Sequence, residues 1–314
     1  MKRVVIFGYG AVGRETAALM SARGDDVLVA QRSAPRNNPL KLAFTACDLT
    51  DSASVAKACA GRDVAICAAG FPYDSTVWER DWPKAMNALL TGCASSGARF
   101  VFADNLYMLG PQTKPLTEDM PLTSYGRKPR LRSAITRLWQ EAHTAGRVKA
   151  VAVRAADFYG PDVPTSVLSA YGVEKLVAGK AAQVPYSPDH PHDFTYVPDF
   201  ARALVTLADA PDDAYGQAWN VPNAPTRSLR ELLTPAASIA SVKPKIQVLP
   251  GWLIPILALF QPILGEIKEM AFQTDRPYRV DASKYQKRFG GATTPFETGL
   301  AETVAYYQAA KRVS

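Results

Sequence analysis

The chain has 314 residues, a size that corresponds to roughly two domains or one large α/β domain with an appended region. Hydrophobic residues make up 47% of it and charged residues 21%, which supplies enough apolar surface for a core and excludes a disordered protein. Basic residues exceed acidic ones by seven, but apart from a group within 127–137 they are scattered, with no nucleic-acid-binding pattern. This charge suits anionic cofactors or substrates, so we expect an enzyme with a small-molecule substrate and no nucleic-acid partner.

The cysteines and the apolar runs indicate in which cellular compartment the protein resides. No pair of cysteines has C-x-x-C spacing, and the apolar run 4–7 is too short for an export signal. The longest apolar stretch, 252–264, is interrupted by prolines and is shorter than the roughly 20 residues that span a bilayer. We therefore predict a cytoplasmic protein with no membrane partner and with buried, reduced thiols. These are Cys47, Cys59, Cys67 and Cys93.

The first half alternates short β-branched runs with segments of helical periodicity. This rhythm predicts a doubly wound parallel sheet, the Rossmann arrangement, and a glycine follows each helical segment where a left-handed cap is expected. The predicted strands are 2–7, 26–30, 42–46, 63–67, 99–103 and 149–153, and the predicted helices are 13–23, 52–60, 82–95 and 129–145.

After residue 155 the rhythm changes and prolines become frequent. We assign residues 1–155 to a dinucleotide-binding domain to which 193–225 return, and residues 156–192 and 226–314 to a smaller, interleaved substrate-binding region. A homodimer is compatible with this organisation.

The segment 8–13 reads Gly8-Tyr9-Gly10-Ala11-Val12-Gly13 and fits G-x-G-x-x-G. It follows an apolar strand and opens a helix, which is the context that makes the motif meaningful. Its glycines permit a tight turn, close approach of a pyrophosphate and helix–strand packing. The alternative is a tight turn of small residues that serves packing alone.

The second predicted strand ends in Gln31-Arg32-Ser33. A carboxylate is expected at this point for the ribose of NAD, whereas Arg32 offers a bidentate partner for a 2′-phosphate, and Arg14 lies within reach of the same group. We therefore predict NADP rather than NAD; the alternative is that Arg32 is a solvated surface residue. The other residues expected along the cofactor are Ser33, Asp48, Ala68, Ala69 and Gly70.

Several later segments complete a family resemblance. Segment 154–161 (RAADFYGP) is similar to R-P-x-x-x-Y-G-P, segment 193–199 (DFTYVPD) to D-F-x-Y-V-x-D, and 281–284 (DASK) to a closing D-x-S-K. Together with the glycine motif, they make the chain resemble the extended and atypical short-chain dehydrogenase/reductases, the NAD-dependent epimerase/dehydratase family. The resemblance implies a Rossmann fold and nicotinamide chemistry, and we include Phe158 among the expected cofactor-binding residues.

The family's catalytic signature is broken in this chain. The resemblance implies a Ser or Thr after the fifth strand and a Tyr-x-x-x-Lys pair on the next helix, in which the phenol exchanges a proton with the substrate. Asn105 stands at the Ser/Thr position, and Tyr125 is followed four residues later by Pro129 instead of Lys.

Two alignments remain open. Tyr125 keeps its role with Lys128 displaced by one residue, or Lys128 and Arg132, one helical turn apart, occupy the Tyr and Lys positions and Tyr107 is the nearby phenol. A third interpretation is that the basic group is only a solvated helix start.

His190 and His192 stand beside prolines without a further ligand cluster, so we predict a polar loop and no metal site. In the resemblance, His192 replaces an arginine that grips the nucleotide of nucleotide-sugar substrates, which argues against such a substrate. The apolar residues in the C-terminal half either line an apolar pocket or form plain core. They are Trp252, Leu253, Ile256, Leu257, Phe260 and Phe272.

The sequence thus favours an NADP-dependent oxidoreductase acting on a carbonyl or alcohol of a small, largely apolar molecule. Two alternatives stay open: a sugar epimerase/dehydratase that uses bound NAD transiently, and a non-catalytic NADP sensor.

Overall fold

A computed structural model describes residues 1–35 and 37–313 of the chain. The described chain divides into two compact units, which interleave along the sequence. The first unit contains residues 1–109, 121–155 and 200–220, and the second contains 110–120, 156–199 and 221–314.

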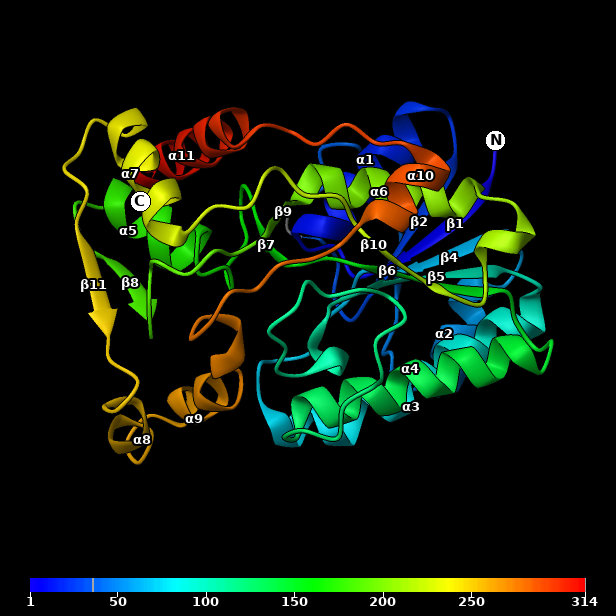
Figure 1. The fold of residues 1–314 in the computed structure, drawn as a ribbon. Coiled ribbons are helices and arrows are strands. Elements are labelled where there is room, and N and C mark those ends of the chain that lie inside the picture. Colours follow the sequence, from blue (N-terminus) through cyan, green and yellow to red (C-terminus); the bar gives the residue numbers. More distant parts are fainter. Residues whose placement is uncertain (36, 314) are drawn as a thin grey trace. The chain divides into compact units, whose positions relative to one another are not determined.

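The first unit is built on a seven-stranded parallel sheet, which confirms the predicted doubly wound fold (Figure 1). The strand order is β10-β6-β5-β4-β1-β2-β3, so the order reverses beside β1, and the switch point lies where such sheets bind ligands. The strands are β1 (Arg3–Phe7), β2 (Asp26–Gln31), β3 (Ala43–Ala46), β4 (Val64–Cys67), β5 (Arg99–Asp104), β6 (Ala150–Arg154) and β10 (Ala218–Asn220). The sequence predicted the first six within one residue at each end but missed the three-residue β10.

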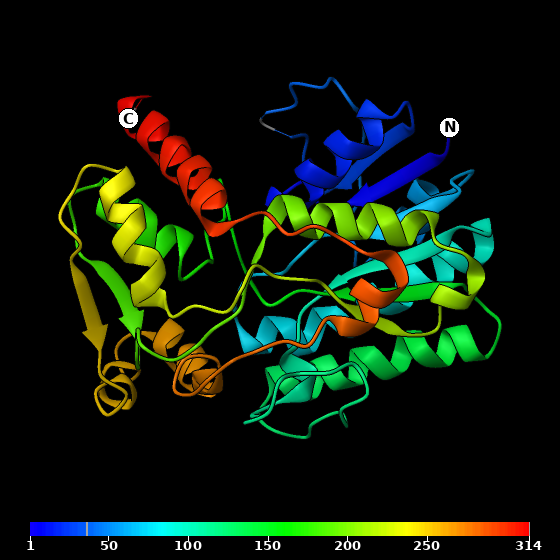
Figure 2. The ribbon, with the colours of Figure 1, turned by 45° about the horizontal axis from the view of Figure 1, so that its top comes forward.

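Helices cover both faces of this sheet (Figures 1 and 2). On one face lie α1 (Ala11–Ala22) and α6 (Val197–Asp209), and on the other α2 (Ser52–Cys59), α3 (Ser75–Ser96) and α4 (Lys128–Thr144). Alternate strand residues such as Phe7, Cys67 and Phe102 pack with α2, α3 and α4 in one buried cluster. All four cysteines are free and buried, as predicted.

Helix α3 begins seven residues earlier than predicted. The Asp74 side chain accepts hydrogen bonds from the Thr76 and Val77 backbone N–H groups, which caps the helix ahead of Pro83. Pro83 therefore lies inside the helix, not at its first turn. The first three turns of α3 bring Trp78 and Trp82 beside the end of β5, where they matter for the site.

The second unit contains both short strands and helices. Its strands form two parallel pairs, β7 (Asp157–Tyr159) with β9 (Phe194–Tyr196) and β8 (Ala182–Pro185) with β11 (Ile246–Leu249). Helices α7 (Leu229–Ile239) and α11 (Phe296–Val313) pack with Phe194 and Tyr159 in a second buried cluster. The remaining helical segments are η1 (Tyr107–Leu109) and η3 (Asp212–Ala214) in the first unit, and η2 (Ser169–Val173), α5 (Glu174–Val177), α8 (Ile254–Leu257), α9 (Pro262–Glu269), η4 (Ala271–Gln273) and α10 (Ser283–Phe289) in the second.

Candidate active site

The glycine-rich turn joins β1 to α1, and two of its glycines are required by packing. Gly8 has φ +90°, and a Cβ at this position would lie 2.6 Å from the Cα of Ala69 in the loop after β4. A Cβ on Gly13 would lie 2.0 Å from the Gly8 carbonyl oxygen. These contacts bring the first turn of α1 close to the ends of β1 and β4.

Gly10 is different, because a Cβ there would meet no protein atom of the described chain within 4 Å. It is the N-cap of α1, and within the described residues no side chain caps this end. The first-turn N–H groups, which include those of Ala11 and Val12, lack acceptors inside the helix. An open cradle facing these donors fits a dinucleotide pyrophosphate. Gly70, after β4, is equally open.

Gln31, which the sequence reasoning did not select, links this turn to the loop after β2. Its Oε1 accepts a hydrogen bond from the Tyr9 backbone N–H (3.0 Å), and its Nε2 donates to the Ser33 carbonyl oxygen (2.8 Å). The sequence signal that could have identified Gln31 is its position as a polar residue at the end of a mostly buried strand.

Arg32 is exposed on that loop. Hydrogen bonds from the backbone and hydroxyl of Thr50 lower the pKa of Asp48, and the Arg32 charge lowers it further. The ion pair with Arg80 lowers the pKa of Asp81, where Arg32 again contributes less. Arg32 thus lies within electrostatic range of two carboxylates. Arg14 lies near Tyr9, where its charge opposes the rise in the pKa of the phenol that burial causes.

Asn105 and Tyr107 follow β5 at the carboxyl edge of the sheet. The Asn105 Oδ1 accepts a hydrogen bond from the Tyr107 backbone N–H (3.0 Å), which leaves its amide N–H₂ as the end that can donate to a substrate oxygen. The Tyr107 ring stacks on Trp78 with centroids 6.3 Å apart and packs against the core.

Three ionisable side chains, Asp104, Arg132 and Arg154, are buried together in the same region. Arg132, 2% exposed, donates from Nη2 to Asp104 Oδ1, and Arg154 Nε lies 3.6 Å from Asp104 Oδ2. The Arg132 guanidinium also lies over the rings of Trp82 (4.8 Å) and Phe102 (4.9 Å). Asp104, at the end of β5, was not selected from the sequence, although a carboxylate ending an apolar strand was a visible signal.

Lys128, 1% exposed, begins α4, and its Nζ lies 4.5 Å from the centre of the Tyr73 ring. Interpreting the basic group as a solvated helix start is therefore wrong for Lys128 and Arg132. That interpretation holds for Arg127, which directly precedes the helix, and for Arg130, because both are exposed and pair with Glu79.

Tyr125, the other candidate phenol, lies in the loop before α4 and is 42% exposed. The structure thus places Arg132 against Asp104, the residue before Asn105, with Lys128 one turn earlier on the same helix and Tyr107 packed against the core.

In the second unit, Phe158 is the middle residue of β7 and pairs with Thr195 of β9. His192 corrects the polar-loop prediction, because it is buried between the rings of Phe194 (4.3 Å) and Tyr278 (5.1 Å). Its Nε2 lies 3.2 Å from Asp157 Oδ2. Among the described residues, no group of three or more His, Cys, Asp or Glu side chains has the geometry of a metal site.

The apolar residues around α8 and α9 correct a second prediction. Phe272 is buried, but Trp252 (72% exposed), Ile256 and Phe260 (79% exposed) face solvent, together with Leu259 and Ile263. Plain core is therefore the wrong interpretation for Trp252, Ile256 and Phe260.

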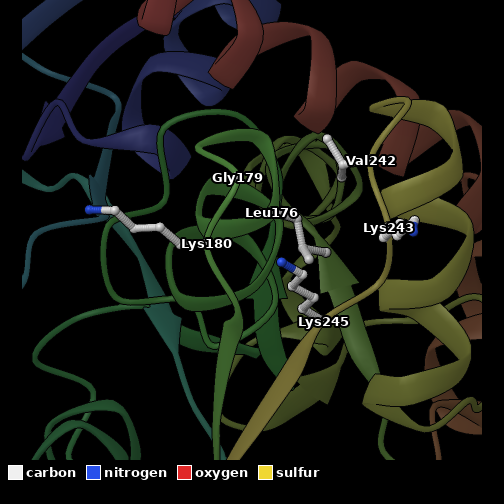
Figure 3. Close-up of a pocket in the computed structure, with 6 residues that line it drawn as sticks. All are labelled: Leu176, Gly179, Lys180, Val242, Lys243 and Lys245. Carbon is white, nitrogen blue, oxygen red and sulfur yellow. The ribbon is translucent and has the colours of Figure 1, made fainter.

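Two cavities are lined by residues of the second unit. One, of about 270 Å³, has Leu176 and Val242 in its wall and is lined by three lysines (Figure 3). Figure 3 shows the Lys180 ammonium directed away from Lys245, so these charges do not converge on one point. The other, of about 360 Å³, lies between residues 223–226 and 279–283.

No helix among the described residues is long and apolar enough to cross a membrane.

Comparison with known proteins gives matches at the level of family and fold. Residues 4–221 match the sequence model of the NAD dependent epimerase/dehydratase family. A dTDP-4-dehydrorhamnose reductase from Mycolicibacterium smegmatis is 29% identical over 222 residues, which cover 66% of this chain and 61% of the reductase, less than two thirds of its length.

Two solved structures share the fold over nearly the whole chain. The dTDP-glucose 4,6-dehydratase of Streptomyces venezuelae, with NAD bound, has a TM-score of 0.81 at 18% identity. The alignment covers 99% of this chain and 98% of the dehydratase chain. The Thermus thermophilus UDP-glucose 4-epimerase, in complex with NAD, has a TM-score of 0.78 at 19% identity, with 98% and 99% covered. At these identities, the likeness concerns the fold.

Proposed function

The chain belongs to the NAD dependent epimerase/dehydratase family, and from this premise we propose that it is an NADP-dependent oxidoreductase acting on the carbonyl or alcohol of a small, largely apolar molecule. The observation that carries the proposal is the open cradle at Gly10, at the N-terminus of α1. The backbone N–H groups there would hold the cofactor's pyrophosphate. The cofactor, when bound, supplies the hydride chemistry, and the chain orients the substrate oxygen and provides the proton.

The preference for NADP rests on Arg32. It follows β2, where a ribose-binding carboxylate is expected in an NAD enzyme, and its guanidinium is exposed to a ligand. Losing a charged hydrogen-bond partner should cost about 1.5–3 kcal/mol, or roughly ten- to a hundred-fold in affinity.

Titration with NADPH and NADH tests the cofactor assignment. Arg32→Ala should bind NADPH more weakly and NADH almost unchanged, whereas Arg147→Ala, which removes another exposed arginine, should leave both affinities unchanged. Tighter binding of NADH than NADPH by the wild type would overturn the NADP assignment.

The apolar substrate class rests on the exposed side chains around α8 and α9. Trp252, Leu259 and Phe260 present large apolar surfaces to solvent, and such patches commonly bind apolar ligands. Trp252→Ala should raise the KM for an apolar substrate, while Ile239→Ala, which truncates an exposed side chain at the end of α7, should not. An equal KM in the two variants would argue against this class.

A panel of carbonyl compounds with NADPH, followed by nicotinamide absorbance, tests the reaction itself. Stoichiometric loss of NADPH with formation of an alcohol supports the oxidoreductase. Turnover without release of oxidised cofactor would instead indicate an epimerase or dehydratase, to which the family also points. Cofactor binding without turnover on any compound would indicate a sensor.

A further inference from the structure

Lys128 is buried, and burying a charged side chain costs desolvation free energy. The residue is only 1% exposed although it starts a helix, and its Nζ lies 4.5 Å from the centre of the Tyr73 ring. A desolvated ammonium costs several kcal/mol, so a surface role does not account for its position. The loop after β4 brings Tyr73 there, and the first turn of α4 brings Lys128, so both lie at the carboxyl edge of the sheet, where open α/β sheets bind ligands.

Arg132 cannot take over the proton chemistry of this edge. Asp104 accepts its hydrogen bond, and the rings of Trp82 and Phe102 lie against its guanidinium. A guanidinium also stays protonated at any pH where the protein is folded, so it releases no proton to a substrate. Its contribution is a fixed positive charge one helical turn from Lys128.

The two candidate phenols, Tyr107 and Tyr125, are less suitably placed to donate a proton than the Lys128 amine. Tyr107 is stacked on Trp78 and packed against the core, and Tyr125 lies in an exposed loop. Lys128, by contrast, combines burial with a group that can both hold and release a proton.

We propose that Lys128 is the proton donor of this enzyme, in place of a phenol. In the direction of reduction, the carbonyl carbon gains a hydride, the electron pair of the C=O bond moves to the oxygen, and that oxygen takes a proton from the Lys128 ammonium. An O–H bond forms as an N–H bond breaks, and the neutral amine regains its proton from solvent. The Asn105 amide holds the same oxygen by donating a hydrogen bond.

Lys128 interacts electrostatically with Asp74, and Arg132, one helical turn further along α4, joins this part of the helix to Asp104. Asp74 precedes α3, and the charges of Arg127 and Lys128 add to the lowering of its pKa that begins with the Val77 N–H. Asp104 ends β5, and Arg132 lies on α4 itself. The inference rests on the proposed oxidoreductase function, because it assigns the acid of that reaction.

The test compares Lys128→Arg and Lys128→Ala with Arg130→Ala, an exposed neighbour on the same helix. Lys128→Arg keeps a positive charge but cannot release its proton, so its kcat should fall roughly a hundred- to ten-thousand-fold with unchanged NADPH affinity. The alkaline fall of kcat in the wild type, where the donor loses its proton, should be absent from the residual activity of this variant. Arg130→Ala should keep most of the wild-type kcat, and a fall of kcat in Tyr107→Phe or Tyr125→Phe as large as that in Lys128→Arg would overturn the proposal.

Chemical rescue separates a proton donor from a structural residue. Added methylammonium or ethylammonium should restore part of the kcat of Lys128→Ala, because a small amine fills the space and carries the proton, and it should not affect Arg130→Ala. Wild-type kcat in Lys128→Arg, or a lowered kcat in Lys128→Ala that amines do not restore, would overturn the proposal. A wild type that reduces no carbonyl compound would instead refute the oxidoreductase function itself.

Discussion

Replacing Asp104 with Asn tests whether the buried ion cluster stabilises the first unit. Asn keeps the shape of the side chain and can still accept the Asn105 backbone N–H (2.8 Å), but it removes the carboxylate charge that contacts both Arg132 and Arg154. Both guanidinium groups are 2% exposed, so water cannot replace the lost carboxylate. Breaking a buried pair in this way costs about 3–5 kcal/mol.

This magnitude is large against the roughly 5–15 kcal/mol that stabilises a typical domain. At about 2–4 °C for each kcal/mol, the Tm of the first unit should fall by roughly 6–20 °C. Tryptophan fluorescence reports on this unit, because four of the five tryptophans are buried in it and the fifth is the exposed Trp252.

Urea unfolding followed by this fluorescence is the assay, and Asp63→Asn is the matched control. Asp63 pairs with Arg3 at 2.8 Å, but both side chains are largely exposed, so its loss should change the urea midpoint little. The reasoning is wrong if Asp104→Asn lowers the free energy of unfolding no more than Asp63→Asn does.

Three further predictions follow from the same structure. Gly10→Ala should fold with wild-type stability but lose NADPH binding, because its methyl fills the open cradle, whereas Gly13→Ala should lose both, since its Cβ would clash with backbone; equal stability losses in a thermal melt would contradict this. Burial raises the pKa of the Cys67 thiol to about 11, above the ordinary 9.0, so the folded state should lose stability as the pH rises from about 9 towards 11. Urea midpoints at pH 8 and pH 10.5 should show a smaller alkaline loss in Cys67→Ala than in the wild type. Tyr107→Ala should lower the Tm, because it removes the ring that stacks on Trp78, while Tyr125→Ala, at a position that is 42% exposed, should leave the Tm nearly unchanged; the opposite order in a thermal melt would disprove this assignment.

The sequence alone determined the architecture of the first unit, because local signals and the fold agree there. Apolar runs gave the first six strands of the sheet, and the glycine motif located the turn between β1 and α1. It missed β10, whose three residues are too few for a periodicity, and it placed the start of α3 at residue 82, seven residues too late. The Asp74 cap was visible in the sequence, but nothing local decided between the two starts.

The candidate site depended more on tertiary structure. Helical spacing already placed Lys128 and Arg132 on one face of α4, but a charge run at a helix start commonly faces water. Whether that face is buried depends on what packs against it, and here the rings of Tyr73, Trp82 and Phe102 come from positions 30–55 residues earlier in the chain than the cations they contact. The same holds for Asp104, which meets Arg132 and Arg154 only because β5, α4 and β6 are neighbours in space. Periodicity fixes which residues share a face of an element, whereas the partners of that face are set by contacts between distant segments, and these decided that two basic residues belong to a buried site.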